Sequence, residues 1–326
     1  GIVPLEAGLI AEKDASNEAH VVGRPELLIY PAEAGLVLAY KVHVKVPGDL
    51  YLFFIDARTG RVVDRWSDLR RQTPLIGEAT GTWQDTKKIS VTEQSGTYQA
   101  LDRGRPALIY TVDARGDYNR WSRNQINPTQ STATDSDNIW DDGAVVDAHV
   151  YAGWTYDYYF NRFGRRGLNG NNMSIVSYVH YWPRSLGGGP DLNNTFWNPT
   201  NNSVNYGDGD GGTFNYFSSA LDIVVHELTH AVSQSSADFI YRDEHGALGE
   251  SFSDIMALGA EFAFENHGSG RQQAEWLIGE DLYINNFSGG TRALRSASNP
   301  QAFGHPDHYN RRYTGSEDNG GVHINS

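Results

Sequence analysis

Two histidines and one glutamate lie within five residues of an otherwise apolar or small stretch, LDIVVHELTHAVSQSS, which runs from Leu221 to Ser236. On an α-helix His226 and His230 stand one turn apart on the same face, so both imidazoles can reach one ion. Glu227 lies about 100° further around the helix axis, beside the ion rather than on it. This position suits a base that acts on a metal-activated water. The five-residue pattern alone is equally compatible with a pair of core histidines, so a third ligand is needed.

The next predicted helix, GALGESFSDIMALGAEFAFE, offers that ligand. Glu250 follows His230 by 20 positions, which is enough for the chain to leave the first helix, turn and return antiparallel. Glu250, Asp254 and Glu261 fall within about 40° of one another on this helix. A solvated acidic face would explain the three acids but not the apolar residues that flank them, and buried carboxylates need cations. Because the chain contains no cysteine, the set His, His and Glu favours zinc with one open coordination position.

The elements that must hold these residues can be predicted from composition and pattern. Residues 1–72 read as a small α/β unit with a helix start near Pro4, and the charged, Pro- and Gly-containing segment SDLRRQTPLIG reads as a linker. Residues 77–140 are turn-rich and strand-like, and a helix is expected from Ala144 to Gly164. The predicted fold class is α+β, in which a β-rich domain surrounds a central metal-binding helix.

The overall composition excludes several classes of partner. The net charge of -14 argues against nucleic acid, because phosphate binding needs an excess of Lys and Arg. There is no apolar run of about 18 residues, so we expect no membrane span. The first residues lack the pattern of a signal peptide. An acidic surface suits calcium.

Two long segments carry a set of specific motifs in a fixed order. They are VVHELTHAVSQSSADFIYRDEHGALGESFSDI and LRSASNPQAFGHPDHYNRRYTGSEDNGGVHINS, with the motifs HELTHAV, GxxxESxSD, GHPDHY and DNGGVH. This order closely resembles the thermolysin family of zinc metallopeptidases, over about Gly77 to Ser326. Residues 1–72 resemble the C-terminal part of that family's propeptide. The resemblance implies a propeptide part at 1–72 and a thermolysin-like N-terminal catalytic domain at 73–326, with the family's helical C-terminal domain absent.

The resemblance also implies roles for individual residues. Zinc would be held by His226, His230 and Glu250, with Asp254 fixing the first histidine. Glu227 would accept the proton of the zinc-activated water. Tyr241 and His323 would donate hydrogen bonds to the oxyanion, and Asp318 would orient His323. The substrate would be bound by Asn194, Thr195 and Arg295, and by an apolar pocket with the walls Phe214, Phe217, Ile223 and Leu294.

The same resemblance implies a calcium site, although this sequence departs from the family pattern at some positions. Asp222, Glu261, Glu275 and Glu280 match the family's calcium ligands, whereas Leu277 stands where a further acid is expected, so we expect one calcium ion rather than two. Gly249 stands where thermolysin has an asparagine that helps to orient the second histidine. The support of His230 must then come from elsewhere or be weaker.

The resemblance therefore implies a secreted, monomeric zinc endopeptidase in a precursor form. It would cut peptide bonds of peptide and protein substrates on the amino side of bulky apolar residues, and its own propeptide would act as inhibitor and folding chaperone. Two other interpretations remain open. One is a calcium-stabilised extracellular binding module with structural histidines, and the other is a catalytically inactive, propeptide-bound assembly.

Overall fold

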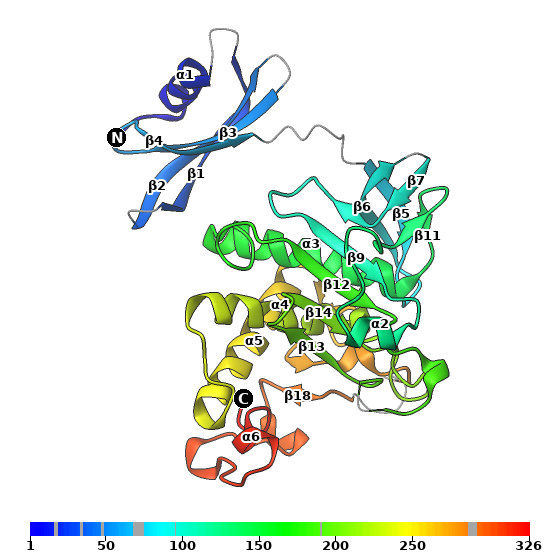
Figure 1. Ribbon diagram of the computed structural model, residues 1–326. Coiled ribbons are helices and arrows are strands. Elements are labelled where there is room, and N and C mark those ends of the chain that lie inside the picture. The colour runs from blue at the N-terminus through cyan, green and yellow to red at the C-terminus, as the bar shows by residue number, and fades with distance from the viewer. Residues whose placement is uncertain are drawn as a thin grey trace. The chain divides into compact units, whose positions relative to one another are not determined.

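The computed structural model describes residues 1–15, 19–32, 35–46, 49–67, 75–94, 96–189, 191–285 and 292–326 (Figure 1). The chain divides into two compact units, Gly1–Thr73 with Tyr159–Arg165, and Pro74–Tyr158 with Arg166–Ser326. Most of the predicted linker falls on residues 68–74, which lie outside the described residues. The predicted C-terminal limit of the linker is wrong, because Leu75 and Ile76 belong to a strand.

The first unit combines one helix with one antiparallel sheet. Its elements are α1 (Pro4–Ala15), β1 (His20–Ala32), β2 (Gly35–Val46), β3 (Asp49–Asp56) and β4 (Val62–Ser67), and the strands lie in the order β1-β2-β3-β4. The helix starts at Pro4, whose fixed backbone angle suits a first helical position. The Glu6 carboxylate accepts the backbone N–H of Val3 at 2.9 Å and so caps this end. Ala7 and Ala11 are fully buried, so the small residues of α1 allow it to pack closely on the sheet.

The second unit opens with two five-stranded sheets. Its first strands are β5 (Leu75–Thr80), β6 (Thr86–Gln94), β7 (Thr97–Gln99), β8 (Leu101–Asp102), β9 (Ile109–Asp113), β10 (Thr134–Asp135), β11 (Ile139–Trp140), β12 (Ile175–Val179), β13 (Thr195–Asn198) and β14 (Ser203–Tyr206). One sheet has the order β10-β7-β6-β5-β11 and the other β13-β14-β12-β9-β8. The predicted β region is therefore observed, with the short helix α2 (Tyr118–Ser122) inserted in it. Strand β13 is an edge strand, which leaves one side of its backbone available.

The long helix α3 (Gly143–Phe163) joins the two sheets. It begins where the Asp142 carboxylate accepts the backbone N–H of Ala144 at 3.1 Å, close to the predicted start. His149 on this helix is hydrogen-bonded through Nδ1 to the Thr111 hydroxyl at 2.9 Å and through Nε2 to the Ser90 carbonyl at 2.8 Å. Thr111 lies in β9 and Ser90 in β6, so one buried imidazole ties the helix to both sheets.

The remaining chain is mostly helix and loop. It contains α4 (Leu221–Ser236), α5 (Asp243–Phe264) and α6 (Asp318–Gly321), the short strands β15 (Asn266–His267), β16 (Gln273–Ala274), β17 (Leu277–Ile278) and β18 (Arg295–Ser296), and the 3-10 turns Arg184–Leu186, Phe217–Ser219, Glu280–Leu282, Pro300–Phe303 and Tyr309–Arg311. Helices α4 and α5 pack against each other. A β-rich part followed by helices agrees with the predicted mixture of helices and strands.

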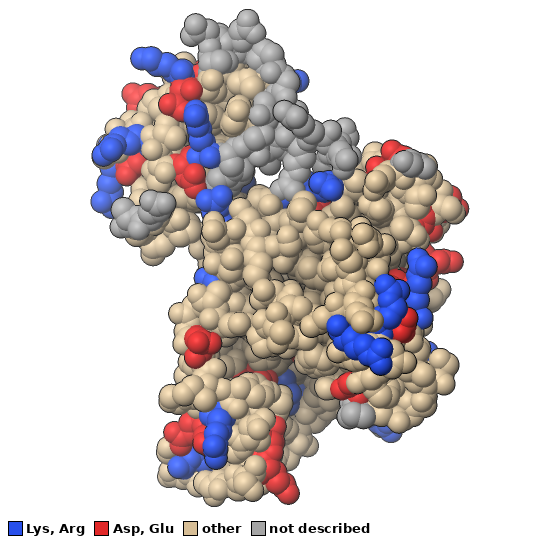
Figure 2. All heavy atoms as spheres, in the orientation of Figure 1, with Lys and Arg blue, Asp and Glu red and all other residues tan. Residues whose placement is uncertain are grey.

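On the face that Figure 2 shows, charged side chains are not gathered into one large patch. On the face in Figure 2, Lys and Arg and Asp and Glu form small groups within a largely uncharged surface. None of the helices in the described ranges is both long enough and apolar enough to cross a bilayer.

Candidate metal centre and active site

His226, His230 and Glu250 form the centre of the candidate site. Helix α4 places the two histidines one turn apart, with their Nε2 atoms 3.2 Å from each other. Glu250 comes from α5, and its Oε2 lies 3.0 Å from Nε2 of His226. One ligand atom of each residue lies within 4.8 Å of the others, and the described residues contain no other such group of three.

These side chains fit a zinc ion by burial as well as by type. Glu250 is fully buried, yet its Oε1 has no hydrogen-bond partner among the residues that the structure describes. A buried carboxylate oxygen without a partner is costly unless a cation meets it. Two imidazole nitrogens and one carboxylate, with one position left open, are a donor set of catalytic zinc sites.

The two histidines differ in their outer support. Nδ1 of His226 is hydrogen-bonded to Oδ1 of Asp254 at 2.7 Å, and Arg295 donates to the same carboxylate at 2.7 and 2.6 Å. Nδ1 of His230 has no hydrogen-bond partner within the described ranges. A Cβ added to Gly249 would meet the ring of Phe239 at 3.5 Å, so this glycine faces an aromatic side chain. Support for the second histidine is thus absent at the position where a polar residue was expected.

Protonation at the centre follows from burial and from these partners. Burial opposes a charge on His226, but hydrogen bonds to Asp254 and Glu250 outweigh it and raise its pKa to about 10. Burial lowers the pKa of His230 to about 4, and the charge on His226 adds to this effect. Burial opposes ionisation of Glu250, but His226 and His230 lower its pKa to about 2. A cation between these groups can replace the proton that His226 carries.

Glu227 lies beside the three ligands and is oriented by the edge strand. Its side chain is buried, and its Oε2 accepts the backbone N–H of Trp197 at 2.9 Å. Burial raises the pKa of this carboxyl to about 7. A carboxyl that gains and loses a proton near neutral pH suits a general base.

Tyr241 and His323 meet next to Glu250, with Nε2 of His323 3.6 Å from Oε2 of Glu250. The Tyr241 hydroxyl lies 3.0 Å from Nε2 of His323, and Nδ1 of His323 lies 2.6 Å from Oδ1 of Asp318. Asp318 also accepts the backbone N–H of His323 at 2.7 Å, so one carboxylate fixes both ring and backbone. The structure therefore brings together Tyr241 and His323, expected to act on an oxyanion, and Asp318, expected to orient His323.

A left-handed turn makes that arrangement possible. Asp318, Asn319 and Gly320 have φ angles of 50°, 51° and 90°, a region that Asp, Asn and Gly tolerate best. A Cβ on Gly320 would come within 2.0 Å of the Asp243 carboxylate, so only glycine fits there. The sequence DNGG thus turns the backbone so that the His323 ring reaches the site.

A cavity of about 490 Å³ opens beside the metal centre. Its lining comprises Thr195, Phe196, Trp197, Pro199, His226, Glu227, His230, Ser233, Gln234, Asp238, Phe239, Tyr241, Gly246, Gly249, Glu250 and His323. Of the residues predicted to bind substrate, Thr195 lines this cavity, whereas Asn194 is exposed next to it and is not part of the described lining.

The predicted apolar walls lie elsewhere. The rings of Phe214 and Phe217 are 5.6 Å apart, and Ile223 and Leu294 both lie next to Gly279. Phe217 and Ile223 are each only 4% exposed, and the described lining of the cavity includes none of these four side chains. Arg295, expected beside them, pairs with Asp254. Their role in a substrate pocket stays a prediction.

A second group of acids is buried behind the metal centre. Asp222, Glu261 and Glu280 are each 1% exposed, and Glu275 contributes a buried oxygen without a hydrogen-bond partner in the described chain. Burial raises the pKa of Asp222, Glu261 and Glu280, and repulsion from Asp222 adds to this effect at Glu261 and Glu280. The four predicted calcium ligands therefore share one buried acidic region.

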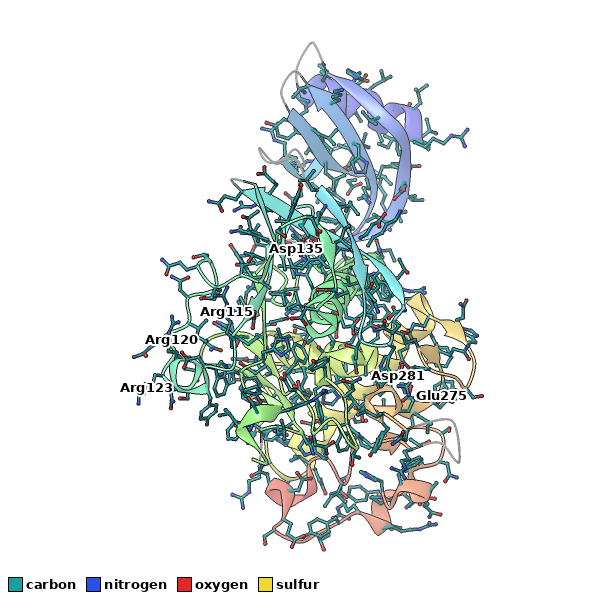
Figure 3. The ribbon with its side chains drawn as sticks, turned by 90° about the vertical axis from the view of Figure 1, so that its right-hand side faces the viewer. Arg115, Arg120, Arg123, Asp135, Glu275 and Asp281 are labelled. Atoms are coloured by element: carbon teal, nitrogen blue, oxygen red, sulfur yellow. The ribbon has the colours of Figure 1, made fainter. Side chains whose placement is uncertain are left out.

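Two further acids of this region were missed in the sequence. Asp281 is 3% exposed, its Oδ1 lacks a partner among the described residues, and it lies beside Glu275 (Figure 3). Burial, with the repulsion of Asp281, raises the pKa of Glu265 to about 8. Glu265 stands one helical turn after Glu261, and Asp281 directly follows Glu280, so spacing could have indicated both.

Comparisons with known proteins agree with this geometry. Residues 76–234 match the family model described as thermolysin metallopeptidase, catalytic domain, and residues 237–326 match the model of its alpha-helical domain. The bacillolysin of Brevibacillus brevis is 41% identical over 97% of this chain and 54% of its own length. The thermolysin of Alicyclobacillus acidocaldarius is 39% identical over 98% of this chain and 59% of its own length. The chain thus spans a little over half the length of these relatives.

A solved structure is similar as well. The precursor of protealysin, a metalloproteinase from Serratia proteamaculans, is 31% identical with a TM-score of 0.53, over 67% of this chain and 65% of that one.

The family models correct one prediction. The expectation that the helical C-terminal domain is absent is wrong, because its model matches residues 237–326. Glu250, Tyr241 and His323 lie in this part, whereas His226 and Glu227 lie in the part that matches the catalytic-domain model. The resemblance had led the sequence interpretation to assign both ligand-bearing helices to the N-terminal catalytic domain.

Proposed function

Because this chain belongs to the thermolysin family of metallopeptidases, we propose that it hydrolyses peptide bonds with the residues that line the cavity next to His226. The observation that carries the proposal is the meeting of His226, His230 and Glu250 beside Glu227, at one wall of an open cavity. A purely structural metal site is closed, whereas a catalytic one leaves room for a substrate.

His226, His230 and Glu250 would hold the zinc ion. When bound, zinc supplies a Lewis acid that polarises the scissile carbonyl. Glu227 takes the proton of the attacking water and later returns it to the leaving amine. The Trp197 backbone N–H holds one oxygen of Glu227 at 2.9 Å, which leaves the other oxygen for the water.

Tyr241 and His323 stabilise the negative charge that develops on the carbonyl oxygen. Both are about half exposed, at 49% for Tyr241 and 46% for the side chain of His323, so a substrate can reach them. Asp318 holds Nδ1 of His323, so Nε2 points to the Tyr241 hydroxyl 3.0 Å away, and both groups can donate to the same oxyanion. Each preorganised donor of this kind contributes about 3 kcal/mol to the transition state.

Calcium would bind the buried acids behind the site. Asp222, Glu261, Glu275 and Glu280 supply the oxygen ligands that Ca²⁺ prefers, and the unpaired oxygens of Glu261 and Glu275 support a cation there. Asp222 lies on α4 one turn before His226, so calcium would also hold the helix that carries the zinc ligands.

The finer features of the enzyme rest on its resemblance to the family. The cut falls on the amino side of bulky apolar residues, with Phe214, Phe217, Ile223, Leu294 and Arg295 forming the pocket and Asn194 and Thr195 binding the substrate backbone. Residues 1–72 act as inhibitor and folding chaperone, and the precursor is a secreted monomer. The similar solved structure from Serratia proteamaculans is itself that of a precursor, which supports the propeptide assignment.

The proposal is tested by metal analysis paired with a peptide-cleavage assay on the full chain. We expect one zinc per chain, loss of hydrolysis on chelation, and loss of both zinc and hydrolysis in His230→Ala. Bound calcium without zinc or hydrolysis would instead identify a binding module. A chain that becomes active only when residues 1–72 are removed would identify an inhibited assembly.

A further inference from the structure

The cavity has a wall that the catalytic residues do not use. The loop after α4 contributes Asp238 and Phe239 to it, and the edge strand β13 contributes Trp197. Gln234, in the last turn of α4, accepts a hydrogen bond from Nε1 of Trp197 at 2.8 Å and fixes the indole. This part of the cavity therefore combines two aromatic rings with one carboxylate.

The carboxylate of Asp238 has no side-chain bonding partner among the described residues. The residue is exposed, and none of the described side chains forms an ion pair or hydrogen bond with its carboxylate. Its backbone is fixed, because its N–H bonds the Ser233 carbonyl at 2.9 Å and its φ of 48° ends the helix. Among the described residues, those that line the cavity include no lysine or arginine. A negative charge thus lies at the cavity wall with no counter-ion among the described residues.

The position of Gln234 along α4 indicates which side of the scissile bond this wall faces. Ile223 precedes Glu227 by four residues and Gln234 follows it by seven, so they lie about 6 Å and about 10 Å away in opposite directions along the axis. On the proposed function, the residue after the cut is bound at the Ile223 end. The wall at the Gln234 end then meets residues before the cut.

We propose that Asp238, with the rings of Trp197 and Phe239, forms a subsite for an arginine or lysine side chain on the amino-terminal side of the scissile bond. The carboxylate gives a guanidinium or ammonium group a charge-assisted hydrogen bond. The aromatic faces attract the same cation and pack along its alkyl stem. This inference rests on the proposed peptidase function and adds a specificity that the apolar pocket does not provide.

The experiment compares peptides that differ only in one charge. A leucine after the scissile bond is kept constant, and arginine or its neutral isostere citrulline is placed at each of the two positions before the bond. For the full chain we expect kcat/KM to be about five-fold higher with arginine at one of these positions, as for a partly exposed ion pair beside an aromatic ring. The ratio should fall toward one in Asp238→Asn and below one in Asp238→Lys.

The matched control is Asp141→Asn. Asp141 is exposed, does not line the cavity, and its removal changes the net charge equally, so the ratio should stay as in the wild type. Peptides that are cleaved without an arginine preference, or a preference that survives in Asp238→Asn, would overturn the subsite. If no peptide is cleaved even after residues 1–72 have been released, the proposed function fails, and the subsite is then decided by the affinities of fluorescently labelled arginine and citrulline peptides, measured by anisotropy. Equal affinities would reject it, and a tighter arginine peptide that Asp238→Asn weakens would support it.

Discussion

Asp254 lies 2.7 Å from Nδ1 of His226, and this contact turns the other nitrogen of the imidazole toward His230 and Glu250. Arg295 pairs with the same carboxylate and keeps it ionised, because it lowers the pKa of Asp254 together with His226 against the effect of burial. His230 has no such partner on its Nδ1 within the described chain. The two candidate zinc ligands on α4 are therefore held unequally.

This inequality predicts that Gly249→Asn strengthens zinc binding. An asparagine at this position can support His230, and its Cβ would meet the Phe239 ring at an ordinary contact distance of 3.5 Å. Partners of metal ligands change affinity by about 10- to 100-fold, so we expect an increase of about ten-fold in a chelator competition assay. Gly249→Ala is the control, because it adds about 0.5–1 kcal/mol of helix stability without a hydrogen bond. Equal zinc affinities in the two variants would contradict the account.

Glu227→Gln should retain zinc and lose hydrolysis. The amide keeps the shape of the side chain and can still accept the Trp197 N–H, but it cannot take a proton from water. We expect kcat to fall by at least about 100-fold, which is the lower range for general base catalysis, with one zinc still bound. Metal content and peptide turnover measured on the same sample check this. Near-normal turnover, or loss of the zinc, would assign Glu227 another role.

Calcium should increase the free energy of unfolding, and this increase should be larger at higher pH. Burial raises the pKa of Asp281 to about 7 and that of Glu265 to about 8, and it also raises the pKa values of Asp222 and Glu280. Acids with a raised folded pKa bind more protons when folded, so without calcium the free energy of unfolding falls as pH increases from about 4 to about 8. Calcium at 100 times its Kd should restore about 2.7 kcal/mol of the free energy of unfolding.

Thermal unfolding with and without a calcium-selective chelator, at pH 5 and pH 8, tests this prediction. The difference in Tm should be larger at pH 8 and should shrink in Asp222→Asn. A Tm that is indifferent to calcium at both pH values would reject the assignment of these acids.

We expect the free energy of unfolding to fall in alkali, when His180 loses its proton. Its Nδ1 lies 2.8 Å from Asp208 and its Nε2 lies 3.2 Å from Asp142. Burial opposes its charge, but these two carboxylates raise its pKa to about 10. The folded pKa lies above the unfolded value, so the stabilisation is complete below pH about 6.5 and is lost as pH rises through about 10. His180→Gln should cost about 2–3 kcal/mol at pH 6 by urea unfolding, as for charged hydrogen bonds, and much less at pH 10.5. Equal costs at the two pH values would count against a charged His180.

Short-range spacing made most of the catalytic centre predictable. The i, i+4 relation of His226 and His230 and the return of Glu250 depend on helix geometry, which the sequence specifies locally. Trp197 and Asp238 could not be found in this way. Trp197 lies on a strand that precedes α4 in the chain and Asp238 on the loop that follows it, and only the tertiary fold brings both to the cavity. The same limit explains the burial of Phe217 and Ile223, since tertiary packing decides which apolar residues remain open to a substrate.

The last prediction concerns the bond that joins the two halves of the chain, which we expect the enzyme to cut itself. The sequence predicts the cut within about Trp66 to Gly77, where Leu69, Leu75 and Ile76 are apolar residues that could follow the cut bond. Strand β5 narrows it, because Leu75 pairs with Val91 and Ile76 with Ser90, and a strand held in a sheet cannot extend into an active site.

Residues 68–74 lie outside the described residues, and Leu69 is the bulky apolar residue among them. We therefore expect a new N-terminus at Leu69 when the full chain is incubated, and none in Glu227→Gln. N-terminal sequencing of both samples measures this. Mixing a trace of active chain with the Glu227→Gln chain shows whether one molecule cuts another, because only then is the variant cleaved. Equal cleavage of the two chains incubated separately, or a new N-terminus within β5, would mean that another protease processes the chain.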